Sequence, residues 1–111
     1  MERIKQLLQG LDPSLMQKAQ RYLDSNKVIS IKHFSDEIEG MMQEKDALFM
    51  PYYRLDDDAF GCQCEQGEGM CIHKAALLLA AQVMMEADHS DYHMAAKILT
   101  ARKLENALCQ K

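Results

Sequence analysis

The N-terminal part of the chain carries two short apolar stripes at helical spacing. The first stripe falls at positions i, i+3, i+4 and i+7 and predicts an amphipathic helix that ends at Gly10. A second helix follows at once, because Asp12 suits an N-cap and Pro13 the first helical position, and the sequence Asp24-Ser25-Asn26 ends it. The two apolar faces, which we expect to pack into a core, are Ile4, Leu7, Leu8 and Leu11, and then Leu15, Met16, Ala19, Tyr22 and Leu23.

From residue 27 onward the pattern changes to short runs of β-forming residues separated by polar turns. The turns, at 35–36, 43–46 and 56–58, are short enough for hairpin connections. Pro51 in the third run cannot donate a ladder hydrogen bond, so we expect an edge strand or a bulge there. The pattern predicts a three- or four-stranded antiparallel meander with strands at Val28–Phe34, Glu37–Met42, Ala47–Leu55 and Ala59–Phe60.

Two more helices are predicted towards the C-terminus. Residues His73–Glu86 are apolar on most faces and indicate a largely buried helix. Ser90 can cap a last helix that runs from Asp91 towards Leu108. Its apolar positions are Met94, Ile98, Ala101, Leu104 and Leu108. Because the chain has no repeat, low-complexity tract or long linker, we expect a single domain over residues 1–111, and Met1 with a complete helical start favours a free-standing protein.

Three thiols and one imidazole fall within the segment Cys62–His73. Cys62 and Cys64 are two residues apart, and Cys71 and His73 repeat that spacing after a loop made flexible by glycines. Thiolate and imidazole are the usual ligands of structural zinc, and four protein ligands leave no open position for a substrate. The spacing therefore predicts one structural Zn2+ in a knuckle at the end of the sheet. The predicted fold is α+β: N-terminal helices, a small antiparallel meander, this zinc knuckle and two C-terminal helices.

The C-x-C, spacer, C-x-H pattern followed by His73-Lys74-Ala75-Ala76-Leu77-Leu78-Leu79-Ala80 resembles the SWIM-type zinc finger. SWIM fingers occur in bacterial Swi-Snf-type ATPases, in MuDR-type transposases and in partners of recombination proteins. Residues 19–28 also resemble the helix-then-strand lead-in of the ATPase accessory regions. The resemblance covers about residues 14–85, with a finger core at about 45–87. It implies that Cys62, Cys64, Cys71 and His73 are zinc ligands, and it implies a role in a DNA-handling machine or in a defence or counter-defence system.

Two positions depart from the SWIM pattern. Glu65 stands where the family often has a proline, and Ile72 stands where it usually has a basic residue. Both changes reduce positive charge or rigidity beside the finger, which argues against nucleic acid at this face. The sequence also contains no Gly-x-x-x-x-Gly-Lys-Ser/Thr phosphate loop, so the ATPase motor of those relatives is absent from it.

The charge is unevenly distributed along the chain. Residues 1–33 carry six basic and three acidic residues, whereas residues 34–71 carry two basic and ten acidic ones. An acidic finger repels a phosphate backbone, so a protein partner is the leading expectation. The alternative is a nucleic-acid-binding zinc finger that uses the basic N-terminal segment. Its expected contacts are Arg3, Lys5, Lys18, Arg21, Lys27 and Lys32.

Other chemistries are weaker alternatives. The nine methionines leave Cu(I) binding or thiol redox chemistry open as a second alternative, since thiolate and thioether select soft ions, although methionine more often fills gaps in a core. Cys71 and His73 cannot act as nucleophile and base while both bind zinc, so no enzyme is expected. We expect His89 and His93 to cap a helix or to be exposed, and Asp56-Asp57-Asp58 to form an acidic hairpin turn.

The sequence also indicates a compartment. Its N-terminus has no apolar signal stretch, and the longest apolar run, Ala75–Ala81, is too short to cross a bilayer. We therefore expect a soluble protein of the reducing cytoplasm, whose cysteines serve a metal and whose Cys109 is a free thiol. Neither a membrane nor a small-molecule substrate is an expected partner.

Overall fold

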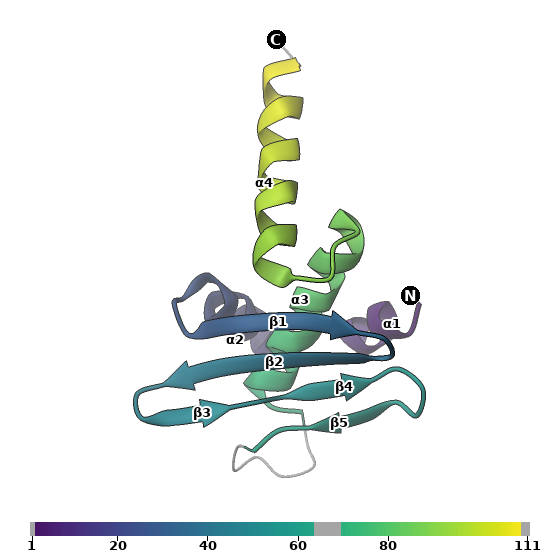
Figure 1. Cartoon of the computed structure of the whole chain (residues 1–111), viewed down its shortest axis with the longest axis vertical. Coiled ribbons are helices and arrows are strands. Elements are labelled where there is room, and N and C mark those ends of the chain that lie inside the picture. The colour runs from purple at the N-terminus through teal and green to yellow at the C-terminus, as the bar shows by residue number, and fades with distance from the viewer. Residues whose placement is uncertain (1, 64–69, 110–111) are drawn as a thin grey trace.

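The computed structural model describes residues 2–63 and 70–109, with side chains over 3–63 and 70–105 (Figure 1). Within these residues the chain forms four helices and five strands. They are α1 (Glu2–Gln9), α2 (Pro13–Asp24), β1 (Val28–Phe34), β2 (Glu37–Glu44), β3 (Ala47–Phe49), β4 (Tyr52–Arg54), β5 (Ala59–Gly61), α3 (Ile72–Ala87) and α4 (Tyr92–Cys109). All the strand pairs are antiparallel. The predicted α+β class is confirmed.

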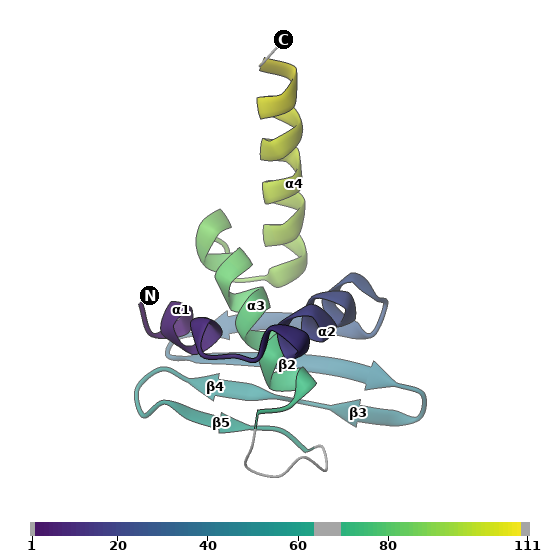
Figure 2. The ribbon, with the colours of Figure 1, turned by 180° about the vertical axis from the view of Figure 1, so that it is seen from behind.

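The sheet has helices on one face. Figure 1 shows α1, α2 and α3 behind the strands, and Figure 2, the view from the other side, shows them in front, with α3 between α1 and α2 in both. The last helix, α4, extends away from the sheet and gives the molecule a long axis of 50 Å, against 33 and 27 Å in the other directions. The opposite face of the sheet carries no helix in these views.

The third predicted strand, Ala47–Leu55, is wrong as a single element. It breaks at residues 50–51 into β3 and β4, and both pair with β2. Pro51 supplies the reason, because it has no N–H to donate and its ring fixes the backbone. Its carbonyl still accepts a hydrogen bond from Gly40 N at 2.9 Å. The strand order is β1-β2-β4-β5, with β3 continuing the β4 side of β2.

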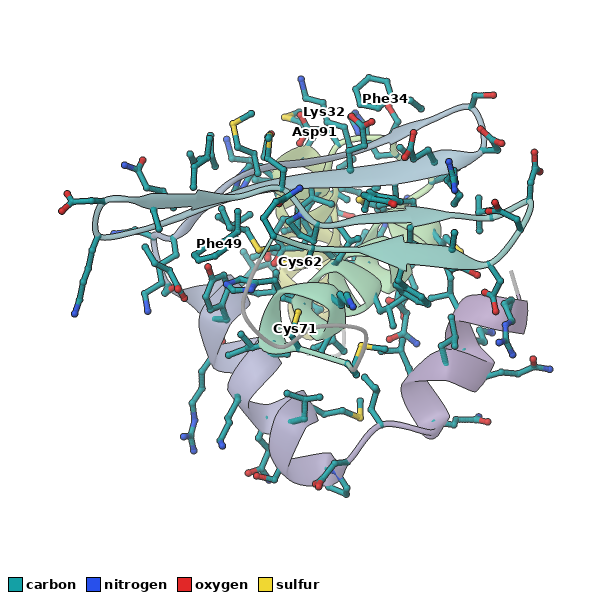
Figure 3. The ribbon with its side chains drawn as sticks, turned by 90° about the horizontal axis from the view of Figure 1, so that it is seen from below. Lys32, Phe34, Phe49, Cys62, Cys71 and Asp91 are labelled. Atoms are coloured by element: carbon teal, nitrogen blue, oxygen red, sulfur yellow. The ribbon has the colours of Figure 1, made fainter. Side chains whose placement is uncertain are left out.

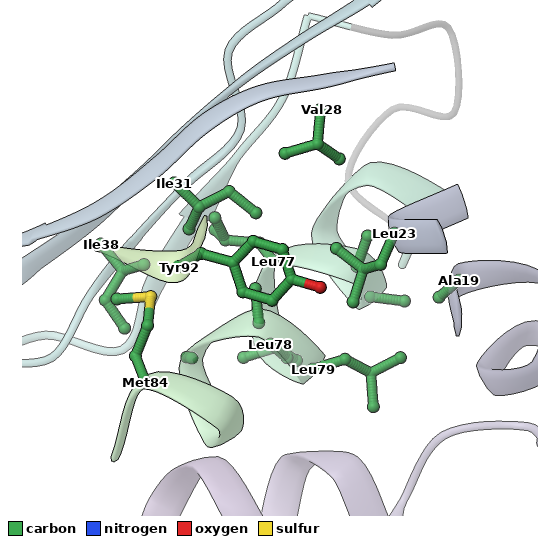
Figure 4. Packing of buried hydrophobic residues seen from close by; sticks show 14 of the residues in the cluster. Ala19, Leu23, Val28, Ile31, Ile38, Leu77, Leu78, Leu79, Met84 and Tyr92 are labelled. Carbon is green, nitrogen blue, oxygen red and sulfur yellow. The ribbon is translucent and has the colours of Figure 1, made fainter. Parts of the chain in front are cut away.

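Helix α3 forms the centre of the core, as its apolar sequence predicts. Leu77 lies between Ile31 and Ile38 of the sheet and Leu23 of α2, and all four side chains are buried (Figure 4). A Cβ at Gly40 would lie 3.1 Å from Leu77 Cδ1, closer than ordinary van der Waals contact. The missing side chain therefore lets α3 pack directly on β2.

Helix α2 begins as the sequence predicts. The Asp12 carboxylate accepts a hydrogen bond from Ser14 N at 2.8 Å, and Pro13 occupies the first turn, where its missing N–H costs nothing. Ile4 and Leu8 of α1 are buried in the same core. Both N-terminal helices thus act as core-facing elements.

The start of α4 differs from the prediction. Asp91, and not Ser90, caps the helix, because its Oδ1 accepts a hydrogen bond from His93 N at 2.9 Å. Ser90 instead uses its carbonyl to accept a hydrogen bond from His33 N of β1 at 2.9 Å, and an antiparallel bridge joins Lys32 to Asp91. The linker between α3 and α4 therefore lies along the outer edge of β1.

Candidate metal centre

Three of the four predicted ligands come together where β5 ends and α3 begins. Cys62 directly follows β5, Cys71 is the N-cap of α3, and His73 lies in its first turn. The Nδ1 atom of His73 lies 3.6 Å from Cys62 Sγ and 4.0 Å from Cys71 Sγ. One ligand atom from each of the three residues lies within 4.8 Å of the others. Cys64, the fourth predicted ligand, lies outside the described residues.

These distances fit a tetrahedral metal site. With Zn–S bonds of about 2.3 Å and Zn–N bonds of about 2.0 Å, a tetrahedron places a sulfur and a nitrogen ligand about 3.5 Å apart. The distance of 3.6 Å between Cys62 Sγ and His73 Nδ1 is close to this value, and the distance of 4.0 Å between Cys71 Sγ and His73 Nδ1 is somewhat longer. Two thiols and an imidazole are also the donor set that zinc prefers. The three residues can therefore hold a metal ion.

Cys71 connects the site to the helix. Its Sγ accepts a hydrogen bond from Lys74 N at 3.5 Å, in the position where a serine or aspartate usually caps a helix. The N-terminus of a helix favours negative charge, so it stabilises a sulfur that binds metal as a thiolate. The helix begins at Ile72, one residue before the predicted start, because Cys71 takes the cap position.

The His73 ring is enclosed by aromatic side chains. Phe49 of β3, which is labelled in Figure 3, stacks on it with ring centroids 4.4 Å apart, and Tyr22 of α2 meets it edge-on at 5.4 Å. Burial lowers the pKa of His73, while the nearby Glu44 carboxylate acts in the opposite direction. A lowered pKa favours the neutral imidazole, which is the form that binds a metal.

The far side of the same ring faces Glu44. Its Oε1 lies 3.7 Å from His73 Nε2, which is buried and has no hydrogen-bond partner among the described residues. The Tyr22 hydroxyl is likewise buried without such a partner, and burial together with Glu44 raises its pKa. Glu44, Tyr22 and Phe49 thus surround the predicted ligand His73.

These surrounding residues are not predicted from the sequence as part of the site, although the strand pattern contains a signal for two of them. Strand β2 continues past its predicted end to Glu44, and its inward positions alternate as Ile38, Gly40, Met42 and Glu44. Phe49 is the cross-strand partner of Met42 and so shares its face. Extending the alternation by two residues would have placed a carboxylate beside the start of α3. No comparable signal identifies Tyr22, because its contact depends on how α2 crosses α3.

The predicted basic contacts fall into two groups. Lys18, Arg21 and Lys27 lie around one pocket of about 230 Å3, which is also lined by Tyr22, Ser25 and Ile72. The Lys27 ammonium lies 5.4 Å from the centroid of the Tyr22 ring. The structure therefore brings these three cations together beside the metal centre.

The other three predicted basic contacts lie elsewhere. Arg3 forms an ion pair of 2.6 Å with Asp58 in the turn between β4 and β5, so its charge is used within the fold. Lys5 lines a separate pocket between α1 and α2. Lys32 lies on the uncovered face of the sheet next to Phe34 (Figure 3). The six predicted basic residues do not form one continuous surface.

Two other predicted features have structural roles. The residues 56–58 form the turn of the β4–β5 hairpin, as expected of an acidic turn. His89 Nδ1 accepts a hydrogen bond from Asp91 N at 3.0 Å, and His93 Nε2 lies 3.1 Å from the Ile29 carbonyl. Both histidines therefore contact backbone atoms at the junction of α4 with its linker and β1.

A comparison of the chain with protein-family models, with curated proteins and with solved structures finds no match. The SWIM resemblance therefore remains a prediction from the motif. None of the described helices is both long enough and apolar enough to cross a bilayer.

Proposed function

We propose that this protein is a zinc-stabilised interaction module that binds a protein partner. In this proposal a single structural Zn2+ is held by Cys62, Cys64, Cys71 and His73. Because four protein ligands fill the tetrahedron, the ion has no open position for water or substrate, and its role is to join the sheet to α3. The chain then acts by binding and not by catalysis. The burial of Cys71 and His73 at this joint supports the assignment.

The observation that carries the proposal is an apolar groove on the uncovered face of the sheet. The groove has a volume of about 430 Å3, and Phe34 and Met50 in it are 53% and 46% exposed. Its apolar lining consists of Phe34, Met41, Met50, Pro51 and Tyr52. Exposed apolar patches of this kind mark sites of protein association.

The charge around the groove indicates the chemistry of the partner. Glu37 and Glu39 line the groove together with a single lysine, Lys32. Two more carboxylates, those of Asp36 and Asp56, lie close together at the end of the sheet near Glu37. Their proximity raises the pKa of Asp56, through hydrogen bonding with Asp36 and through the negative charge of Asp36. The proposed occupant is a partner segment with apolar side chains and at least one lysine or arginine. The SWIM resemblance further suggests a partner from a DNA-handling or defence system.

The test compares two variants that place a charge at exposed apolar positions. Tagged parent, Phe34→Glu and Leu104→Glu proteins are used to capture partners from the native host after nuclease treatment. Leu104 of α4 is 63% exposed and serves as the control. The captured protein is identified by mass spectrometry and its affinity is then measured by calorimetry. We expect binding to parent and Leu104→Glu but at least tenfold weaker binding to Phe34→Glu, and equal affinities would overturn the proposal.

The second candidate function is nucleic-acid binding through the pocket of Lys18, Arg21 and Lys27. The observation that favours this candidate is that these three basic side chains line one pocket next to α2. Binding through phosphates is strongest at low salt, so it should be detectable at about 50 mM salt and should weaken steeply above that. A DNA and RNA titration of the parent and of Arg21→Gln decides the matter. The absence of binding at low salt eliminates this candidate.

The third candidate, Cu(I) or thiol redox chemistry, rests on the same donor atoms. Thiolates bind Cu(I) as well as Zn2+, so the donor set alone does not separate the two metals. Metal analysis of the protein purified from its host gives the answer. One tightly held zinc per chain that does not exchange with Cu(I) eliminates the copper candidate.

A further inference from the structure

The two nitrogens of His73 face different groups. Nδ1 lies on the side of the thiols, 3.6 Å from Cys62 Sγ, and Nε2 lies on the opposite side of the ring, 3.7 Å from Glu44 Oε1. The imidazole ring therefore lies between Glu44 and a metal bound by the sulfurs and Nδ1. This geometry excludes Glu44 as a ligand of that ion, and Glu44 can contact only the Nε2 side of the ring.

The Nε2 side needs a hydrogen-bond acceptor. When Nδ1 binds a metal, Nε2 carries the proton and becomes a donor, and a buried donor without an acceptor destabilises the folded protein. Nε2 is buried, and Glu44 supplies the carboxylate that faces it. The Glu44 side chain is 32% exposed and lies at the end of β2, so it has room to move the remaining distance to Nε2.

We propose that Glu44 is a positioning residue for the metal centre: it accepts a hydrogen bond from Nε2–H of His73 and so fixes the tautomer in which Nδ1 binds zinc. This inference rests on the zinc site of the proposed function. Carboxylates in this position orient metal-bound histidines, and their loss commonly weakens metal affinity by 10–100-fold. Phe49 and Tyr22 add to the effect, since the stacked and edge-on rings hinder rotation of the imidazole.

The experiment measures zinc affinity by competition with a chromophoric chelator in the full chain. The variants are Glu44→Ala, which removes the acceptor, and Glu44→Gln, whose amide oxygen still accepts a hydrogen bond. Glu86→Ala is the matched control, because Glu86 is an exposed glutamate of α3, the helix that carries His73. We expect affinity to fall about 10–100-fold in Glu44→Ala, to recover in part in Glu44→Gln and to stay within about twofold of the parent in Glu86→Ala.

A spectroscopic measurement separates positioning from a general loss of stability. Nitrogen-15 spectra of the zinc-loaded parent should show His73 with a metal-bound Nδ1 and a protonated Nε2, with the Nε2 proton protected from exchange. In zinc-loaded Glu44→Ala that proton should exchange faster. Unchanged affinity and unchanged exchange in Glu44→Ala would overturn the inference alone, whereas a parent that binds no zinc would overturn the proposed function.

Discussion

Phe49 lies almost flat against the imidazole of His73, with the ring planes 21° apart. Phe49 comes from β3, the short strand that the break at Pro51 separates from β4. The candidate metal centre thus includes a side chain that precedes Cys62 by thirteen residues and belongs to a different hairpin. The position of His73 therefore depends on how the sheet is folded as well as on the ligand motif.

Replacing Phe49 with leucine should weaken the metal centre without removing a ligand. The change removes an aromatic stack worth about 0.5–1.5 kcal/mol beyond the area that it buries. We expect zinc affinity to fall severalfold and the melting temperature of the loaded protein to fall by a few degrees. Chelator competition and thermal melts measure the two effects. Leu48→Ala, in the neighbouring exposed position, is the control and should change neither.

Replacing Cys71 with serine should abolish both zinc binding and cooperative unfolding. The binding free energy of structural zinc in small modules is on the order of 10 kcal/mol, which is comparable with the whole stability of a domain of this size. Metal analysis and chemical denaturation monitored by circular dichroism measure the outcome. Cys109→Ser, outside the ligand motif, should retain zinc. A Cys71→Ser protein that melts like the parent would refute the structural role of the metal.

Gly61 should not tolerate alanine. A Cβ there would lie 2.1 Å from Cε1 of Tyr52, which covers this end of β5, so the ring or the strand must shift. Overpacking of this kind costs about 1–3 kcal/mol, and the next residue is Cys62, a predicted ligand. We expect lower stability and weaker zinc binding in Gly61→Ala. Gly10→Ala is the matched control, because its Cβ would meet only backbone oxygens at 3.7 Å, and calorimetry compares the two.

The acidic end of the sheet should make stability depend on pH. Hydrogen bonding with Asp36 and its charge raise the pKa of Asp56 above the ordinary value of 3.8, so the charged form of Asp56 is disfavoured in the folded state. Because the pKa of Asp56 is higher in the folded state than in the unfolded state, the free energy of unfolding falls as the pH rises from the unfolded-state pKa to the folded-state pKa. Asp56→Asn should therefore raise the melting temperature at neutral pH and have no such effect well below pH 3.8.

Asp57→Asn provides the comparison within the same turn. It removes an equal charge but also breaks the ion pair of Asp57 with Arg54, in which the atoms lie 3.3 Å apart. We therefore expect Asp57→Asn to give no comparable rise in melting temperature at neutral pH. Thermal melts over a pH series measure both variants, and an equal gain for Asp56→Asn at every pH would contradict the role of charge repulsion.

The helices, and the approach of Cys62, Cys71 and His73 to one another, could be predicted from the sequence because local rules govern them. Asp12 and Pro13 specify a helix start through their own chemistry, and the apolar run after His73 indicates a buried helix wherever it packs. The division of the third strand was harder, since the consequence of Pro51 depends on its partner strand. The sequence predicts an edge strand or a bulge at Pro51. In the structure the parts before and after Pro51 pair separately with β2, so the strand is broken there.

The surroundings of the candidate site could not be predicted in the same way. Glu44, Phe49 and Tyr22 reach His73 through strand register and helix crossing, which are long-range properties of the fold. Likewise, the use of Arg3 in an ion pair with Asp58 depends on the approach of α1 to a distant turn. From the sequence alone Arg3 counts as a cation that could contact nucleic acid, although in the fold its charge is paired with Asp58.

The linker between α3 and α4 has a consequence for association between molecules. An exposed strand edge is a template for pairing with another chain and hence for aggregation. On β1 this edge is partly occupied, because His33 N donates to the Ser90 carbonyl and His93 Nε2 lies 3.1 Å from the Ile29 carbonyl. A second molecule would have to displace these contacts before it could extend the sheet at β1. The segment that directs α4 outward thereby also protects the β1 edge of the sheet from pairing with another molecule.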